Sequence, residues 1–211
     1  MVNVVSAVPE RPYRGVQAAD RLAERRERLL AAGLDVLGAR DLIELTVRGI
    51  CHRAGVASRY FYESFADKDE FVVAVFDRVV GDLAASTQAA VAAVPSAEQT
   101  RAGMAHLVSA IAGDLRVGRM LFSTQLTNAL LVRKRAESSA LFAMLSGRHM
   151  QNVLRVPGND RIKAVAHFVV GGVAQTISAW LAGDVHLAPD QLVDQLTALL
   201  GQLDDPALFR G

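Results

Sequence analysis

Side chains that usually carry catalysis or hold metal ions are sparse in this chain of 211 residues. Its single cysteine, Cys51, excludes an internal disulfide bond and a Cys-x-x-Cys zinc site. The histidines form no His-Glu-x-x-His motif, and the adjacent Cys51 and His52 have no further histidine or cysteine at metal-site spacing; the histidines are His52, His106, His149, His167 and His186. The sequence contains neither a Gly-x-Ser-x-Gly turn nor a glycine-rich phosphate-binding loop. We therefore expect no catalytic residue, no metal ion and no cofactor, and we do not expect an enzyme.

The most informative stretch is a short run of aromatic and basic residues between Ser58 and Phe65. Phe61 and Phe65 lie four residues apart, so a helix here turns both rings inward. The side chains that this leaves outward are Ser58, Arg59, Tyr60, Tyr62 and Glu63. Such a surface is typical of a helix that binds in the major groove of DNA. A tyrosine-rich face on an ordinary helical hairpin is the alternative.

Each of these outward side chains matches a contact that duplex DNA offers. Arg59 can donate two hydrogen bonds to O6 and N7 of guanine, and Tyr60 can place its ring against a thymine methyl group. Ser58 can reach a base edge or a phosphate, and the Tyr62 hydroxyl can donate to a phosphate. Lys68 stands at the predicted start of the next helix, where free amides also favour a phosphate. The residues that we expect to bind DNA are Thr46, Arg48, Ser58, Arg59, Tyr60, Tyr62 and Lys68.

The residues before this stretch predict the first helix of a helix-turn-helix. Thr46 is a typical N-cap residue. The apolar residues that follow repeat at helical spacing, at Val47, Ile50, Cys51 and Ala54. Gly55 then allows a sharp reversal of the chain, since glycine enters the left-handed region without strain. Two short helices joined by such a turn match the helix-turn-helix pattern.

The whole chain is predicted to be all-α. Its six prolines fall outside the long periodic stretches, and apolar residues repeat every three or four positions rather than alternating. We expect about nine helices, near residues 21–39, 47–54, 58–64, 68–93, 97–113, 115–123, 128–154, 159–183 and 189–203.

The composition is that of a globular protein without a dominant charge. Apolar residues make up 51%, and 23 basic side chains against 22 acidic ones leave a net charge of +1. The N-terminus lacks an export signal and the lone cysteine fits a reducing compartment, so we expect a cytoplasmic protein. Twenty consecutive uncharged residues separate Lys163 from Asp184, about the length of a membrane span. The polar residues Gln175 and Thr176 within them favour a helix buried by protein, and we expect no membrane partner.

The stretch from about Arg25 to Asp77 resembles the N-terminal DNA-binding domain of the tetracycline-repressor (TetR) family. In that family, an arginine-bearing first helix precedes the helix-turn-helix, and a Lys-Asp/Glu motif opens the fourth helix. The corresponding motifs here are Thr46-Val47, Ala54-Gly55-Val56, Tyr62-Glu63-Ser64-Phe65 and Lys68-Asp69-Glu70-Phe71. Several positions depart from the family pattern, among them Cys51 in place of a usual alanine and the segment 41–44 in place of a glycine-containing loop. Ala57 replaces a common serine and Tyr60 replaces a residue that is usually small, so base contacts cannot be transferred from relatives.

The resemblance implies three regions: an N-terminal arm at 1–20, a helix-turn-helix domain at 21–78, and a ligand-binding and dimerisation domain at 79–211. An apolar pocket is then expected among the helices of the last region. Its candidate lining residues are Met104, His106, Phe122, Gln125, Phe142, Met144, Phe168, Gln175 and Trp180. For each of these residues alone, a place in the core is the alternative.

Dimerisation has independent support in the sequence. The uncharged helix and the apolar stripe of residues 189–203 carry more apolar surface than one small bundle readily hides. A second copy packed across a twofold axis would cover this surface, with the glycines allowing close approach. The candidate interface residues are Gly171, Gly172, Leu192, Leu196, Leu199 and Leu203.

These inferences lead to a hypothesis with two alternatives. The chain is expected to be a homodimeric repressor that binds double-stranded operator DNA and is released by a small, largely apolar effector. One alternative is a helical small-molecule carrier or enzyme whose DNA-binding motif no longer functions. The other is a transcriptional activator of the same fold.

Overall fold

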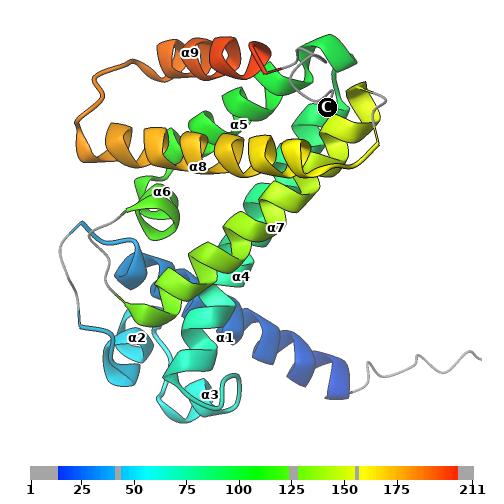
Figure 1. Ribbon diagram of the computed structural model, residues 1–211. Coiled ribbons are helices and arrows are strands. Elements are labelled where there is room, and N and C mark those ends of the chain that lie inside the picture. Colours follow the sequence, from blue (N-terminus) through cyan, green and yellow to red (C-terminus); the bar gives the residue numbers. More distant parts are fainter. Residues whose placement is uncertain (1–13, 41–43, 124–127, 155–156, 204–211) are drawn as a thin grey trace, which may run out of the picture.

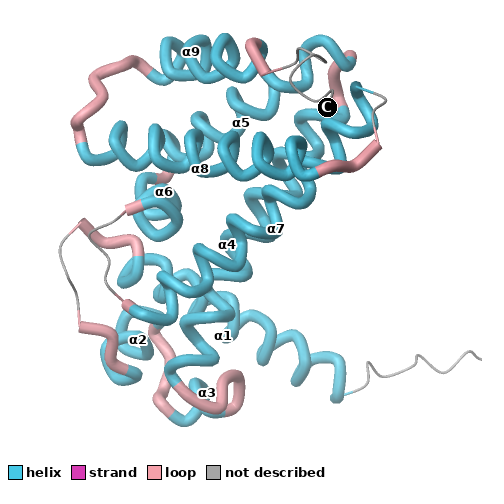
Figure 2. Tube along the Cα trace, viewed as in Figure 1, coloured by secondary structure: helices cyan, strands magenta, loops and turns pink. Residues whose placement is uncertain are grey.

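The computed structural model describes residues 14–40, 44–123, 128–154 and 157–203. Over these residues the chain contains helices, turns and loops and no strand (Figures 1 and 2). The helices are α1 (Arg14–Leu37), α2 (Val47–Ala54), α3 (Arg59–Tyr62), α4 (Lys68–Ala92), α5 (Gln99–Gly113), α6 (Leu115–Phe122), α7 (Ala129–Leu154), α8 (Asp160–Ala182) and α9 (Pro189–Gly201), with a 3-10 turn η1 (Ser96–Glu98) before α5. The all-α prediction is confirmed.

Most helices end within two residues of their predicted bounds, and the first and third helices differ in ways that matter for the N-terminal domain. The first begins at Arg14 rather than near residue 21, so its first turns lie in the segment predicted as an arm. The remainder of that segment, residues 1–13, lies outside the described residues. The third helix covers only Arg59–Tyr62 rather than residues 58–64, since Glu63 and Ser64 form a turn and Phe65 lies in the loop after it.

An aromatic cluster holds the N-terminal domain together. Phe61, Phe65 and Phe71 are buried, and their ring centroids lie 5.1–5.5 Å apart. Leu29 of α1 and Ile50 of α2 belong to the same core. Aromatic pairs at these distances contribute about 0.5–1.5 kcal/mol each beyond the area they bury. The cluster therefore fixes α3 against α1, α2 and α4, although α3 is too short to be stable alone.

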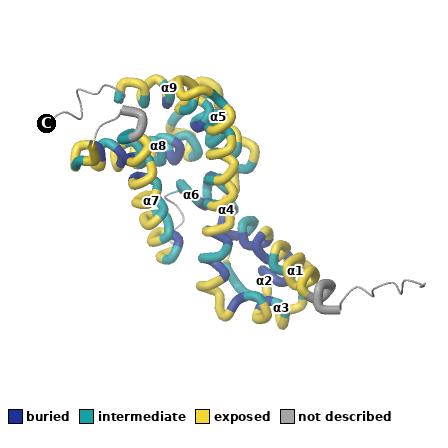
Figure 3. Tube along the Cα trace, turned by 90° about the vertical axis from the view of Figure 1, so that its right-hand side faces the viewer, coloured by how far each residue is buried: buried dark blue, intermediate teal, exposed yellow. Residues whose placement is uncertain are grey.

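The C-terminal domain is built around the continuation of α4. The α4 helix extends upward from the N-terminal domain beside α7, while α8 and α9 lie across the far end (Figures 1 and 3). A second core cluster joins α5 to α9 through Val108, Leu192, Val193 and Leu196. The α8 helix packs closely on α7, where a Cβ at Gly147 would lie 3.6 Å from the Ala166 side chain.

One face of α8 is not covered by this chain. By length and composition, Asp160–Ala182 is the one described helix apolar enough to cross a membrane, yet only 17% of its most apolar window is buried. The prediction that protein buries this helix is therefore fulfilled on one side only. The exposed side includes Phe168, Gly171 and Gly172.

Candidate nucleic-acid interface

The turn between α2 and α3 has the geometry that its sequence predicted. The Thr46 hydroxyl accepts a hydrogen bond from the Gly49 amide at 3.1 Å and caps α2. At the other end Gly55 adopts φ 65° and ψ 37°, in the left-handed region. The Val56 amide then donates to the Cys51 carbonyl at 3.0 Å, closing the helix. These bonds set the direction in which the chain enters α3.

The short α3 helix presents two of its four side chains, Arg59 and Tyr62, to solvent. Phe61 is fully buried and anchors the helix to the domain core. Ser58, Arg59 and Tyr62 are exposed, whereas Tyr60 is half-buried. The helix therefore protrudes from the domain on a single aromatic anchor, at the end of the molecule farthest from α9 (Figure 1).

Arg59 and Tyr60 are joined directly. The Arg59 Nη2 donates to the Tyr60 hydroxyl at 2.7 Å, and the Arg59 guanidinium carbon lies 4.7 Å from the centre of the tyrosine ring. This hydrogen bond and the adjacent positive charge lower the pKa of Tyr60 from its ordinary value. The same bond raises the pKa of Arg59.

A residue of α1, Arg25, completes this group, although it was not among the residues predicted to bind DNA. The Arg25 guanidinium carbon lies 4.0 Å from the centre of the Tyr60 ring. Its Nη1 is 3.9 Å from a carboxylate oxygen of Glu63, and its Nε donates to the Arg21 carbonyl at 3.0 Å. The Tyr60 ring, predicted to face a thymine methyl, therefore contacts two guanidinium groups in the DNA-free protein.

The start of α4 differs in one respect from its predicted role. The Asp67 carboxylate accepts from the Glu70 amide at 2.8 Å, and the Glu70 carboxylate accepts from the Ala66 amide at 2.6 Å. The Asp67 carboxylate therefore already binds one amide of the first turn of α4, and both carboxylates place negative charge at the helix N-terminus, which disfavours a phosphate there. Lys68 is exposed there, and its ammonium group remains the phosphate ligand that this position offers.

The remaining predicted DNA-binding residues lie on α2 and its cap. Arg48, in the first turn of α2, is exposed. Thr46 is half-buried, and its hydroxyl oxygen is used by the cap. Basic residues of α1, α2, α3 and the start of α4 thus all belong to the N-terminal domain, whose helices lie together in Figure 1.

Comparison with known proteins identifies this arrangement. Residues 29–75, which include α2, α3 and most of the aromatic core, match the family of bacterial regulatory proteins named tetR. Residues 29–75 therefore form a DNA-binding domain of the TetR type. TetR proteins are DNA-binding transcriptional regulators, and the match lies on the helix-turn-helix described above. No protein with a curated description matches the sequence.

Solved structures of bacterial transcriptional regulators share the fold over most of the chain. A TetR-like transcriptional regulator from Rhodococcus sp. RHA1 has a TM-score of 0.63 at 20% identity, over 83% of this chain and 92% of that one. A putative TetR-family regulator from Syntrophomonas wolfei gives 0.70 at 13% identity, over 86% and 95%. The regulator FadR from Bacillus subtilis, solved with stearoyl-CoA, gives 0.64 at 20% identity, over 82% and 96%. At these identities the likeness concerns the fold alone.

Among the predicted pocket residues, Met104 and Trp180 pack against the same core cluster, the one that joins α5 to α9. Met104, Phe122 and Phe142 are half-buried. Two polar candidates already have partners within the chain: His106 Nε2 lies 2.8 Å from Ser86 Oγ, and Trp180 Nε1 donates to the Leu187 carbonyl at 2.9 Å. The candidates on the surface are Met144, Phe168 and Gln175. Gln125 lies outside the described residues.

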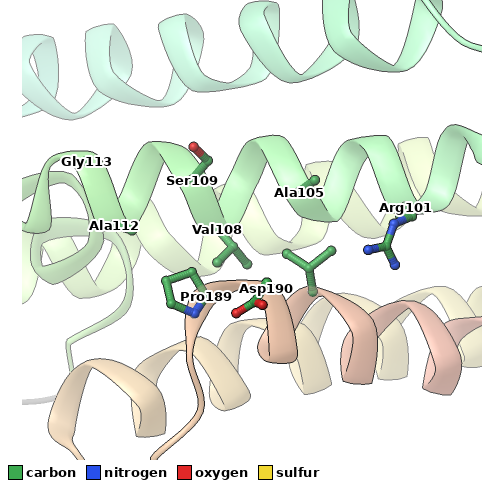
Figure 4. Close-up of a pocket in the computed structure, with 9 residues that line it drawn as sticks. Arg101, Ala105, Val108, Ser109, Ala112, Gly113, Pro189 and Asp190 are labelled. Atoms are coloured by element: carbon green, nitrogen blue, oxygen red, sulfur yellow. The ribbon is translucent and has the colours of Figure 1, made fainter.

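An open depression lies elsewhere, between α5 and the start of α9. Figure 4 shows Arg101, Val108 and Asp190 at its edges and floor. The other residues lining it are Ala105, Ser109, Ala112, Gly113, Pro189 and Val193. None of the predicted pocket residues belongs to this set. The described residues also contain no group of three or more His, Cys, Asp or Glu side chains that could hold a metal ion.

The predicted dimer residues fall into two groups. Gly171, Gly172 and Leu199 are exposed, and Leu203 is half-buried. Leu192 and Leu196 instead lie in the core cluster with Val108 of α5. This placement corrects the expectation for these two leucines, because side chains buried inside one protomer cannot reach a partner.

Proposed function

We propose that this protein is a homodimeric repressor of the TetR type that binds double-stranded operator DNA through α2 and α3. The observation that carries the proposal is the helix α3, anchored by the buried Phe61 and presenting Ser58, Arg59 and Tyr62 to solvent. A protruding helix suits the major groove, where arginine recognises guanine, and Arg59 keeps N–H donors beyond the one that binds Tyr60. In this proposal, exposed Arg48 and Lys68 contact phosphates on either side of the groove.

Dimerisation through α8 supports the same function. Ala164, Phe168, Gly171, Gly172 and Gln175 are exposed at helical spacing along this helix. No atom lies within 4 Å of the position that a Cβ would occupy at either glycine, so a partner helix has room to approach. A twofold pair would present two α3 helices to half-sites about 34–36 Å apart on DNA. Leu199 of α9 is a second exposed contact of this interface.

The effector in this proposal is a small, largely apolar molecule that enters the C-terminal domain. The FadR structure similar to this one holds stearoyl-CoA, a ligand with a long apolar chain. Effector binding would act on α4, which runs through both domains (Figure 3). A coupling of about 1–3 kcal/mol would lower operator affinity roughly 5- to 150-fold. A cytoplasmic location, without enzymatic activity, follows from this function.

A DNA-binding titration tests the proposal. The full-length protein is titrated against a fluorescent duplex from upstream of its own gene and against a shuffled duplex of equal length, at 50 and 200 mM salt. We expect the first duplex to bind at least about a thousandfold more tightly, with an affinity that falls steeply as salt rises. Absence of binding to either duplex at low salt would instead support the small-molecule carrier. A reporter gene under the same duplex then distinguishes repression from activation.

A further inference from the structure

We propose that Tyr60 and Arg25 are positioning residues that set the DNA sequence specificity of Arg59. The proposal rests on the proposed function, in which Arg59 recognises a base. The observation behind it is a continuous set of contacts from α1 to the tip of Arg59 on α3. Its consequence is that base discrimination by Arg59 depends on a tyrosine hydroxyl and on an arginine from another helix.

This set of contacts begins on α1, a long helix. Arg25 lies in the middle of α1, and its Nε donates to the Arg21 carbonyl one turn earlier at 3.0 Å. Its guanidinium group is also 3.9 Å from the Glu63 carboxylate, just beyond α3. Only 22% of the Arg25 side chain is exposed, although an arginine on a helix surface is usually free in solvent. Two polar contacts and partial burial therefore hold this guanidinium group in one place.

Arg25 in turn fixes the ring of Tyr60. Its guanidinium carbon lies 4.0 Å from the centre of that ring, the distance of a close cation–π contact. Tyr60 is half-buried, whereas the neighbouring Tyr62 is exposed. The hydroxyl of Tyr60 is consequently presented from a restrained ring.

That hydroxyl holds Arg59. The Arg59 Nη2 donates to it at 2.7 Å, so one of the five N–H groups of the guanidinium is used inside the protein. The remaining four still allow the paired hydrogen bonds that guanine accepts. An unrestrained arginine must lose rotamer freedom when it binds a base, at a cost that corresponds to about two- to tenfold in binding. Because Tyr60 restrains Arg59 beforehand, part of that loss occurs before DNA binds.

The contacts of Arg25 also offset a negative charge next to the recognition helix. Glu63 follows α3 directly and would repel a DNA phosphate. Arg25 places a positive group beside that carboxylate. The same residue therefore restrains the tyrosine ring and offsets the one acidic side chain next to the recognition helix.

Selection from a library of random-sequence duplexes tests the proposal with the full-length protein. The variants are Tyr60→Phe, Arg25→Lys, Arg59→Ala and, as the matched control, Tyr62→Phe. Arg59→Ala identifies the base position that Arg59 recognises, as the position whose preference is lost. We expect Tyr60→Phe to lower discrimination at that same position by about two- to tenfold. Preferences at the other positions and the salt dependence of binding are expected to be unchanged.

The two other variants separate positioning from simpler roles. Arg25→Lys keeps the positive charge but loses the planar group over the ring, so it should lower discrimination at the same position. It also provides the test if Tyr60→Phe does not fold. Tyr62→Phe removes a hydroxyl that has no partner in the described structure. It should weaken binding to all DNA sequences alike without changing the base preference at any position.

Four results would overturn the proposal. Tyr60→Phe and Arg25→Lys could retain the wild-type preference at the Arg59 position. Either variant could change the base preference at a different position, which would mean that Tyr60 recognises a base itself. Either variant could also sharpen discrimination at the Arg59 position, which would mean that Tyr60 holds Arg59 away from DNA. Arg59→Ala could leave the base preference intact at every position, which would overturn the proposal while still showing that the protein binds DNA. If the wild-type protein selects no sequence, the proposed function itself has failed.

Discussion

The guanidinium group of Arg116, at the start of α6, forms an ion pair with the carboxylate of Asp35, near the end of α1. Arg116 also pairs with Asp114, which caps its own helix, at 2.5 Å. One turn later, the Arg119 Nη1 donates to the Gly38 carbonyl at 3.1 Å. These contacts attach the second domain to the last turn of α1. Any movement of α6 therefore acts on the domain that carries α3.

The first prediction concerns the pH dependence of this attachment. Hydrogen bonds from the Arg116 side chain hold the pKa of Asp114 below its ordinary value. A carboxylate with a lowered pKa stabilises the fold above the ordinary pKa, about 3.9, and this stabilisation is lost as pH falls through the lowered value. Arg116→Gln should therefore cost stability at pH 7 and lose less than the wild type on acidification. Because both groups are partly exposed, we expect a difference of only about 0.5–1 kcal/mol.

Urea unfolding at pH 7 and pH 3, at one protein concentration, measures this difference. The control is Lys163→Gln. Lys163 forms the corresponding pair with Asp160 at the start of α8, but both side chains are largely exposed. The control should have the same stability as the wild type at both values of pH. Equal acid sensitivity of Arg116→Gln and the wild type would contradict the role assigned to Arg116.

The second prediction concerns the close approach of the two domains at Gly38. A Cβ at this residue would lie 2.7 Å from the Arg116 Cα, a distance that real Cβ atoms do not show. Since the neighbouring atoms are backbone, Gly38→Ala must push α6 away from α1. We expect it to destabilise the protein by about 1–3 kcal/mol in urea or thermal unfolding.

Gly81 provides the matched control for this substitution. It lies in α4, and no atom is within 4 Å of the position of its missing Cβ. Gly81→Ala should stabilise the protein by about 0.5–1 kcal/mol, because alanine favours the helix. If both alanine variants had the same effect, the contact between Gly38 and Arg116 would not restrain the two domains.

Local signals in the sequence were sufficient to predict most of the helices. The period of the apolar residues placed α2 and α4 almost to the residue, because Thr46, Gly55 and Asp67 mark their ends through short-range hydrogen bonds. The bounds of α3 were less accurate. Four residues give too little period to define a helix, and packing of Phe61 in the core decides its length.

Contacts between distant residues could not be predicted in the same way. Arg116 and Asp35 are 81 residues apart, and nothing in either segment indicates its partner. Leu192 and Leu196 illustrate the same limit differently. Their spacing correctly indicated an apolar face on α9, but periodicity does not say whether the same chain or a second copy covers it. Val108 of α5 covers it within the protomer.

The third prediction separates phosphate contacts from base contacts. Lys68 is exposed at the start of α4, where Asp67 and Glu70 occupy the helix end. Lys68→Ala should weaken binding to all DNA sequences alike and lower the slope of log affinity against log salt by about 1. Anisotropy titrations between 50 and 200 mM salt measure this slope. Lys163→Ala, an exposed lysine on α8, is the control and should leave the slope unchanged; an unchanged slope for Lys68→Ala would exclude a phosphate contact.

The last prediction concerns the exposed side of α8. Phe168 is 69% exposed in the protomer, and it lies one turn before the two glycines that leave room for a partner helix. Burial of a large aromatic side chain at the centre of an interface is worth 2 kcal/mol or more. Phe168→Arg should therefore raise the dissociation constant of the dimer by at least about thirtyfold, measured by sedimentation velocity over a range of concentrations.

Val132→Arg is the control for a new charge on an exposed apolar site. Val132 is 53% exposed, but it lies at the start of α7, next to Leu131 in the core cluster of the N-terminal domain. The Val132→Arg variant should leave the dimer intact.

A protomer that lost its partner would also hold only one α3 helix on DNA. The Phe168→Arg variant should therefore bind a duplex with a single half-site as tightly as one with two half-sites. A wild-type monomer at micromolar concentration, or an unchanged Phe168→Arg dimer, would show that α8 is not the dimer interface.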